Sequence, residues 1–368
     1  MYDPSHQAEW QWPGLMSRRT RAQEPRFYWR GRALGGSSTV NAQIAIRGVP
    51  AAFDAWAAQG CTGWSAADVM PLFDRIEDDA EFATEAGARR GGPLPVYRAP
   101  LDAWGAVDRG LREAALAGGY AWKADLNAPQ GEGVSCNPIN SRNGHRVTTN
   151  DGYLEPARNR PNLEIRCEAL VDRILFEGRQ AVGLRVRFGT EAWTEIRGRE
   201  IVLCAGAIHS PAILMRSGIG PAEQLRALGI PVVHAQEAVG GHYMDHPFVW
   251  ATMEMKPGQR ALGPDARHTN CCVTYSSGLA GGGERDMIFV AYNHRGLTGL
   301  EPTPQGAVGV GLYDAFSRGS LHLTSADPEI NPVIEENMLD DPRDRLRLRD
   351  ALRRLASLTT HPALADLA

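Results

Sequence analysis

Two glycine-rich phrases hold the residues whose types and spacing best suit ligand binding. The first, residues 31–41, reads GRALGGSSTVN, and the second, residues 206–221, reads GAIHSPAILMRSGIGP. Glycines allow a backbone to press against a flat ligand, and the N–H groups at a helix start favour negative charge. Ser37, Ser38 and Asn41 add hydroxyl and amide groups. The two phrases therefore predict contact with a flat, polyanionic cofactor, and the alternative is that Ser37 and Asn41 only cap turns.

Short motifs surround the two phrases in a fixed order. They are RG at 47–48, FDAW at 53–56, GWS at 63–65, YL at 153–154, RPNL at 160–163, DHP at 245–247 and GSLHL at 319–323. Together with both phrases, these motifs closely resemble the glucose-methanol-choline (GMC) family of FAD-dependent oxidoreductases, and in particular bacterial alcohol and choline dehydrogenases. The resemblance extends over nearly the whole chain.

The resemblance implies FAD as the cofactor and assigns residues to it. Ser37, Asn41, Ala42 and Ile44 would hold the flavin ring and ribityl chain, and Val171 would present its backbone to the adenine. Some members attach FAD through a histidine at the position of Val40, so FAD bound without a covalent link is implied here. The full predicted set is Gly35, Gly36, Ser37, Ser38, Asn41, Ala42, Ile44, Val171 and Gly206.

Two parts of the family pattern have no match in these residues. Members open with G-x-G-x-x-G, which no part of this chain contains; residues 309–314, GVGLYD, lack the third glycine and read as a strand. The family's catalytic histidine, followed by Gly-Thr, and its second His or Asn base follow the region that matches residues 320–368. The resemblance thus implies a chain truncated at both ends, with weak FAD binding, little turnover and no catalytic residue of its own.

The ten histidines give no better candidate for a base or a metal ligand. His209 lies at a variable family position, His246 belongs to the DHP motif, and His361 lacks the Gly-Thr context. His242 and His246 have the spacing of a zinc pair but no Glu between them, and Pro247 argues against a helix there. No metal site is predicted.

The predicted fold is α/β, α+β overall. Strict alternation at 182–188 and apolar runs at 170–176 and 287–292 predict strands, and a periodic apolar stripe predicts a helix over 342–358. A strand at 201–204 followed by Ser210 as N-cap and Pro211 at N1 would form a cofactor-facing turn. The resemblance implies a Rossmann-like FAD-binding domain without its first βαβ unit, at 1–50 and 151–247. A substrate domain with an antiparallel sheet would occupy 51–150 and 248–368, the family's C-terminal segment starting near 315.

Composition excludes several classes of protein. The 368 residues are 43% hydrophobic with a formal net charge of −4, which supports a packed core and argues against a nucleic-acid partner. Six cysteines without a C-x-x-C pair favour buried thiols in a reducing compartment. The start of the chain has no apolar signal segment and the sequence no long apolar run. A cytoplasmic protein is expected, with peripheral membrane association as an alternative.

The resemblance implies oxidation of a small primary alcohol, choline-like or aliphatic, with hydride passing to flavin N5. Oxygen and a quinone both stay open as the electron acceptor. Two further hypotheses remain: an inactive or merely interacting fragment, and a lyase acting on hydroxynitriles.

Overall fold

The computed structural model describes residues 8–83, 89–129, 131–261, 267–294 and 304–368. Its largest element is a five-stranded sheet in the order β13-β16-β15-β14-β5, in which every neighbouring pair is antiparallel. The strands are β5 (Gly133–Cys136), β13 (Phe248–Glu254), β14 (Cys271–Tyr275), β15 (Met287–Tyr292) and β16 (Gln305–Leu312). The predicted antiparallel sheet is therefore present, and the predicted strand at 287–292 is β15.

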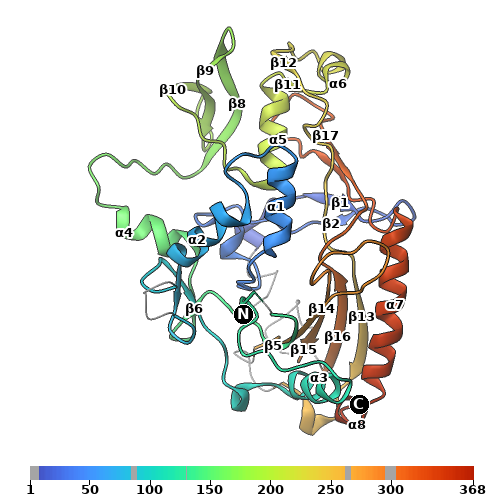
Figure 1. The fold of residues 1–368 in the computed structure, drawn as a ribbon. Helices are drawn as coiled ribbons and strands as arrows, with labels where there is room; N and C mark the ends of the chain where they lie inside the picture. Colours follow the sequence, from blue (N-terminus) through green and yellow to red (C-terminus); the bar gives the residue numbers. More distant parts are fainter. Residues whose placement is uncertain (1–7, 84–88, 130, 262–266, 295–303) are drawn as a thin grey trace.

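Helices cover one face of this sheet. They are α3 (Ala106–Ala117), α7 (Pro342–Thr359) and α8 (Pro362–Ala365), and α7 runs along the outer side of the sheet (Figure 1). Leu111 of α3, Phe289 of β15 and Leu348 of α7 meet in one apolar core, each at most 4% exposed. Full burial of such side chains stabilises by about 1.5–3 kcal/mol each, so this layer holds the sheet and its helices together.

A buried charge cluster ties α7 to the sheet. The Arg347 guanidinium donates to Asp286 at 2.9 Å and to Asp344 at 2.6 Å, and all three side chains are fully buried. Another buried carboxylate, that of Asp108 in α3, accepts the backbone N–H groups of Asn270 and Cys271 at 2.8 Å. Because charged groups in a dry core need partners, these contacts fix the helices at defined positions along the strands.

Smaller sheets surround this body. One has the order β17-β18-β1-β2, with β1 (Met16–Arg18), β2 (Arg26–Phe27), β17 (Ser320–His322) and β18 (Val333–Glu335). A three-stranded antiparallel sheet consists of β8 (Ala169–Glu177), β9 (Gln180–Phe188) and β10 (Thr194–Arg197). It projects from the end of the molecule away from the five-stranded sheet (Figure 1). The short pairs are β3 (Glu77–Asp79) with β4 (Leu94–Val96), β6 (Ser141–Arg142) with β7 (His145–Arg146), and β11 (Ile219–Gly220) with β12 (His234–Ala235). The alternation at 182–188 is thus a strand, β9.

The remaining helical elements line the connections between the sheets. They are α1 (Pro50–Ala58), α2 (Ala66–Ile76), α4 (Glu155–Ala157), α5 (Gly206–Arg216), α6 (Ala222–Ala227), η1 (Ala8–Trp10), η2 (Gly36–Thr39), η3 (Leu101–Ala103), η4 (Asn150–Leu154) and η5 (Pro257–Gln259). In α2 the Ser65 side chain accepts the Asp68 N–H while the Asp68 carboxylate accepts the Ser65 N–H. This reciprocal cap sets where the helix begins.

Two local predictions around the second glycine-rich phrase are wrong. Residues 201–204 form no strand, because a strand needs a hydrogen-bonded neighbour and no described strand pairs with them. The helix begins at Gly206, so Ser210 is not its N-cap and Pro211 lies inside it. Ile208 and Ala212 of its first turns are buried together in a second apolar core. That packing outweighs the hydrogen bond lost at Pro211.

Candidate functional site

The first glycine-rich phrase forms a tight turn, η2, whose two glycines face different surroundings. Gly35 and Gly36 both have positive φ, 86° and 55°. A Cβ on Gly35 would lie 2.8 Å from Thr39 Oγ1 and 3.1 Å from Thr148 Cβ, so protein packing alone requires glycine there. A Cβ on Gly36 would meet nothing within 4 Å. The open side of Gly36 is therefore a surface on which a flat ligand could lie.

Two threonines far along the chain hold this turn in place. Thr149 donates its backbone N–H to Ser38 Oγ at 3.0 Å and its hydroxyl to the Gly35 carbonyl at 3.1 Å. Ser38 in turn donates its hydroxyl to the same carbonyl at 2.5 Å. Ser38 thus works within the protein, and Ser37 accepts the Gly31 N–H at 3.1 Å. Sequence reasoning missed Thr148 and Thr149, although Asp151, which accepts from the Thr148 N–H and hydroxyl, marks a capped turn.

The segment after this turn runs beside residues 138–140 and leaves alternate backbone groups free. Ala45 donates its N–H to the Pro138 carbonyl at 2.9 Å, and Asn140 donates to the Gln43 carbonyl at 2.9 Å. In such antiparallel pairing the residue between, Ile44, directs its own N–H away from the partner. The N–H groups of Ala42 and Ile44 have no acceptor among the described residues. These two groups, the row of free N–H donors, follow the turn within a few residues along the chain.

Asn41 is more occupied than predicted. Its side-chain oxygen accepts the Gln43 N–H at 2.9 Å and an Arg146 guanidinium N–H at 3.1 Å, and its backbone N–H donates to the Ser37 carbonyl. What it retains for a ligand is its amide NH₂ group. The backbone of Gln43 has a φ of 64°, in the left-handed region. A residue other than glycine adopts this conformation only when its neighbours impose it.

The second phrase, in α5, packs against β8. Arg216 donates to the carbonyl of Asp172 at 2.8 Å and, at 3.4 Å, to that of Val171, while the Ser217 hydroxyl accepts the Ile174 N–H at 2.8 Å. At the other end of the helix Gly206 is exposed, with a φ of 80° and open space where a Cβ would be. Nearby Val202 is 77% exposed. Because α5 packs against β8, Gly206 and Val171 lie on two elements that contact each other.

One indole ring connects the two phrases. Gln11 forms a β-bridge with Gly31, the first residue of the first phrase. Next to it, Trp12 donates its backbone N–H to the Arg30 carbonyl at 3.2 Å. The Trp12 ring lies against His209 of the second phrase, with centroids 3.7 Å apart and ring planes tilted by 30°. Burial lowers the pKa of His209 to about 4, so this imidazole is neutral near pH 7.

The histidines weighed as bases have structural surroundings. His209 is 8% exposed beneath Trp12, and His361 caps α8 by accepting the Ala363 N–H at 3.2 Å. His246 lies against the Tyr313 ring, with centroids 4.8 Å apart. The Asp245 carboxylate beside it accepts the Tyr28 hydroxyl at 2.5 Å, which joins the DHP motif to the residues leading into the first phrase.

An aromatic wall lies on the face of the five-stranded sheet opposite the helices. We define it as Phe248, Trp250 and Tyr292; the first two rings lie 4.6 Å apart, and Trp250 meets Tyr292 edge-on at 4.4 Å. Phe248 and Trp250 can lie over β16 because Gly311 and Gly309 stand opposite them in that strand, where a Cβ would collide with the rings. The prediction of a strand at 309–314 is therefore correct as far as Leu312, where β16 ends. The glycines of this strand make room for the aromatic rings.

The segment that follows the first phrase reaches the face of the sheet that carries the aromatic wall. Ile46, just beyond the row of free N–H donors, packs against the buried cluster of this face, which consists of Leu126, Cys272, Ile288 and Val290. By contrast, a cavity of about 330 Å³ lies beside β1 and β18, and none of the predicted flavin residues lines it. Among the described residues, no helix combines the length and apolar character needed to cross a membrane.

Comparisons with known proteins agree with one another. The N-terminal profile described as GMC oxidoreductase matches residues 15–248, and the C-terminal profile of the same description matches residues 315–367. The 5-(hydroxymethyl)furfural oxidase of Methylovorus sp. (strain MP688) is 33% identical over 96% of this chain and 67% of that protein. An oxygen-dependent choline dehydrogenase of Pseudomonas aeruginosa (strain LESB58) is 34% identical over 91% and 64%.

Similarity to a solved structure extends over the same range. The crystal structure of pyridoxine 4-oxidase from Mesorbium loti superposes with a TM-score of 0.85 and 28% identity, covering 99% of this chain and 73% of that one. The chain thus spans about two thirds of the length of the curated relatives it matches.

Proposed function

Since the chain belongs to the GMC oxidoreductase family of FAD-dependent enzymes, with its FAD-binding domain and sheet-rich substrate domain, we propose that it binds FAD without a covalent link and oxidises a primary alcohol. The observation that carries this proposal is the open space beside Gly36 together with the free N–H groups of Ala42 and Ile44, in a segment whose Ile46 packs on the same cluster as Phe248 and Tyr292 of the aromatic wall.

The residues fit a flavin in both shape and polarity. Gly36 leaves space for a ring, and the free N–H groups of Ala42 and Ile44 are the donors that a flavin edge needs, most of all when reduction makes it negative. Gly206, at the start of α5, has the exposed backbone that suits a phosphate or ribose contact. Val40 is buried and offers no nucleophile, in keeping with FAD held by non-covalent contacts. We keep Gly35, Ser37, Ser38, Asn41 and Val171 in the proposed set, with Ser38 and Gly35 shaping the turn.

When bound, FAD supplies the N5 atom that takes the hydride from the alcohol carbon. The chain's own part is to place the ring beside the aromatic wall, whose flat faces can stack on a planar alcohol or attract a quaternary ammonium group. We assign the base that takes the hydroxyl proton to neither His209 nor His361, because both are engaged in structural contacts.

We also propose the division into an FAD-binding part, 1–50 and 151–247, and a substrate part, 51–150 and 248–368. It is supported by the pairing of β5 with β14 and by the packing of α3 on the same sheet. The pairing of β1 with β18 crosses this boundary, so β17 and β18 of the substrate part share one sheet with β1 and β2 of the FAD-binding part.

The test is an absorbance spectrum of the purified chain with added FAD, followed by anaerobic addition of choline or 5-(hydroxymethyl)furfural. Bleaching of the flavin bands by either alcohol supports the proposed reaction. Acid precipitation should release the flavin into the supernatant if it is not covalently held. Oxygen uptake compared with reduction of a soluble quinone separates the two acceptors. A folded chain that takes up no FAD would refute the proposal.

A further inference from the structure

A single side chain, that of Asn127, holds the backbone just beyond the row of free N–H donors. Its amide oxygen accepts the Arg47 N–H at 3.0 Å, and its amide NH₂ donates to the Ala45 carbonyl at 2.9 Å. Those are the two hydrogen bonds that a neighbouring strand would supply, but here they come from one buried side chain. On its other side the same segment bonds through Ala45 to Pro138, so it is held from two directions.

The Arg47 side chain adds a second anchor at the same point. Its guanidinium donates two hydrogen bonds of 2.7 Å to the Glu77 carboxylate and one of 2.9 Å to Asp74, at the end of α2. A two-pronged arginine–carboxylate pair fixes direction as well as distance. Glu77 is 6% exposed, so solvent weakens this pair little.

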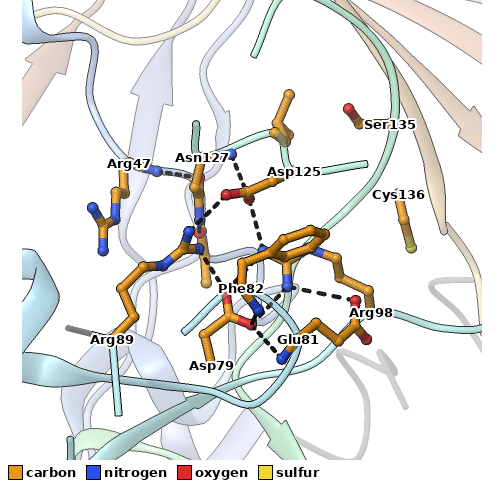
Figure 2. Close-up of polar contacts among 12 residues, drawn as sticks. Arg47, Asp79, Glu81, Phe82, Arg89, Arg98, Asp125, Asn127, Ser135 and Cys136 are labelled. Atoms are coloured by element: carbon orange, nitrogen blue, oxygen red, sulfur yellow. Dashed lines mark hydrogen bonds and ion pairs between the residues drawn. The ribbon is translucent and has the colours of Figure 1, made fainter. Parts of the chain in front are cut away.

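Behind these two anchors lies a buried ion network that makes them rigid (Figure 2). Arg89 donates to Glu77, Asp79 and Asp125 at 3.2, 2.5 and 2.6 Å, and Arg98 donates to Asp79 and Asp125 at 3.1 and 2.9 Å. Asp125 also accepts the Asn127 N–H at 3.0 Å, which orients the asparagine. The network thus links the anchors of the segment to Asp79 of β3 and to Asp125.

The segment needs such support because its backbone is strained. Gln43 lies at a φ of 64°, and a left-handed residue other than glycine persists only where its surroundings determine it on several sides. We propose that Asn127 and Arg47 are positioning residues, which hold the backbone so that the N–H groups of Ala42 and Ile44 point at the flavin. This inference rests on the proposed function, since it concerns the same site.

The experiment compares Asn127→Ala with Asn137→Ala. Asn137 is also a buried asparagine, but its side chain bonds Thr269 at 3.1 Å and not the segment. Three quantities are measured on the full chain: the dissociation constant of FAD, the visible circular dichroism of bound flavin, and amide hydrogen exchange at Ala45 and Arg47 without FAD. Loss of two hydrogen bonds should weaken FAD binding roughly tenfold in Asn127→Ala. It should also increase the rate of hydrogen exchange at both amides by about tenfold or more.

We expect Asn137→Ala to stay within about twofold of the original chain in FAD affinity, with an unchanged flavin dichroism. Arg47→Lys, which keeps the charge but loses the fork, should fall between the two. Two outcomes would overturn this inference and leave the proposed function standing. One is amide exchange at Ala45 and Arg47 that is as slow in Asn127→Ala as in the original chain. The other is equal FAD affinity in the two alanine variants. If the original chain takes up no FAD, the proposed function and this inference both fail.

Discussion

Replacing Gly36 by alanine separates a ligand-facing glycine from one that only serves the fold. Gly36 has a φ of 55° and open space on its Cβ side. Gly178, in the turn between β8 and β9, has a φ of 60° and equally open space, which makes Gly178→Ala a matched control. Both variants place an L side chain in the left-handed region, at a cost of about 1–2 kcal/mol each. The two should therefore lose stability to a similar degree.

FAD binding should distinguish them. If a flavin ring lies on Gly36, the added methyl group overpacks that contact by about 1–3 kcal/mol, which weakens binding about 5- to 160-fold. The control changes no surface near the predicted flavin residues, so its FAD affinity should stay within about twofold. Thermal unfolding without FAD measures the strain, and titration of flavin fluorescence measures the affinity. Equal FAD affinity in the two variants would refute the placement of the ring.

Three further outcomes follow from the packing. Burial lowers the pKa of His209 from 6.5 to about 4, so the unfolded chain binds more protons than the folded chain between these pH values. The free energy of unfolding should therefore fall by up to about 3 kcal/mol as the pH drops through that window. His209→Phe should remove this part of the acid unfolding curve. Gly309→Ala puts a Cβ within 2.5 Å of an indole carbon and should destabilise by about 1–3 kcal/mol, with a changed near-UV dichroism; an unchanged spectrum would contradict the account of the aromatic wall. Arg347→Met leaves two fully buried aspartates without their partner and should cost about 3–5 kcal/mol in urea unfolding, whereas Arg354→Met, at an exposed pair on the same helix, should cost less than about 1 kcal/mol.

Local patterns in the sequence were sufficient for several features. The alternation at 182–188 predicts β9 because a strand with two different faces requires that period. The reciprocal cap of Ser65 and Asp68 at the start of α2 is equally local, because it involves residues only three apart. The family resemblance rests on the same kind of information, since it depends on short motifs in a fixed order.

Where a partner distant in sequence decides the conformation, the prediction failed or could not be made. Residues 201–204 have a strand-like composition and form no strand, for want of a paired neighbour. Pro211 has the local form of a helix start but lies inside α5, because apolar contacts of the first turns reach residues elsewhere in the fold.

The amino-acid sequence by itself determined the family, the FAD cofactor and the positions of the two glycine-rich phrases, because glycines, hydroxyl groups and motif order are properties of neighbouring residues. Only the tertiary structure decided which groups remain available to a ligand. It engages the Asn41 oxygen and the Ser38 hydroxyl within the protein and leaves Gly36 and the N–H groups of Ala42 and Ile44 open. It also brings Thr149 to the first phrase and Asn127 to the segment that follows it. The physical reason is that hydrogen bonds and packing act through space, so a group's availability depends on residues that the chain brings near only when it folds.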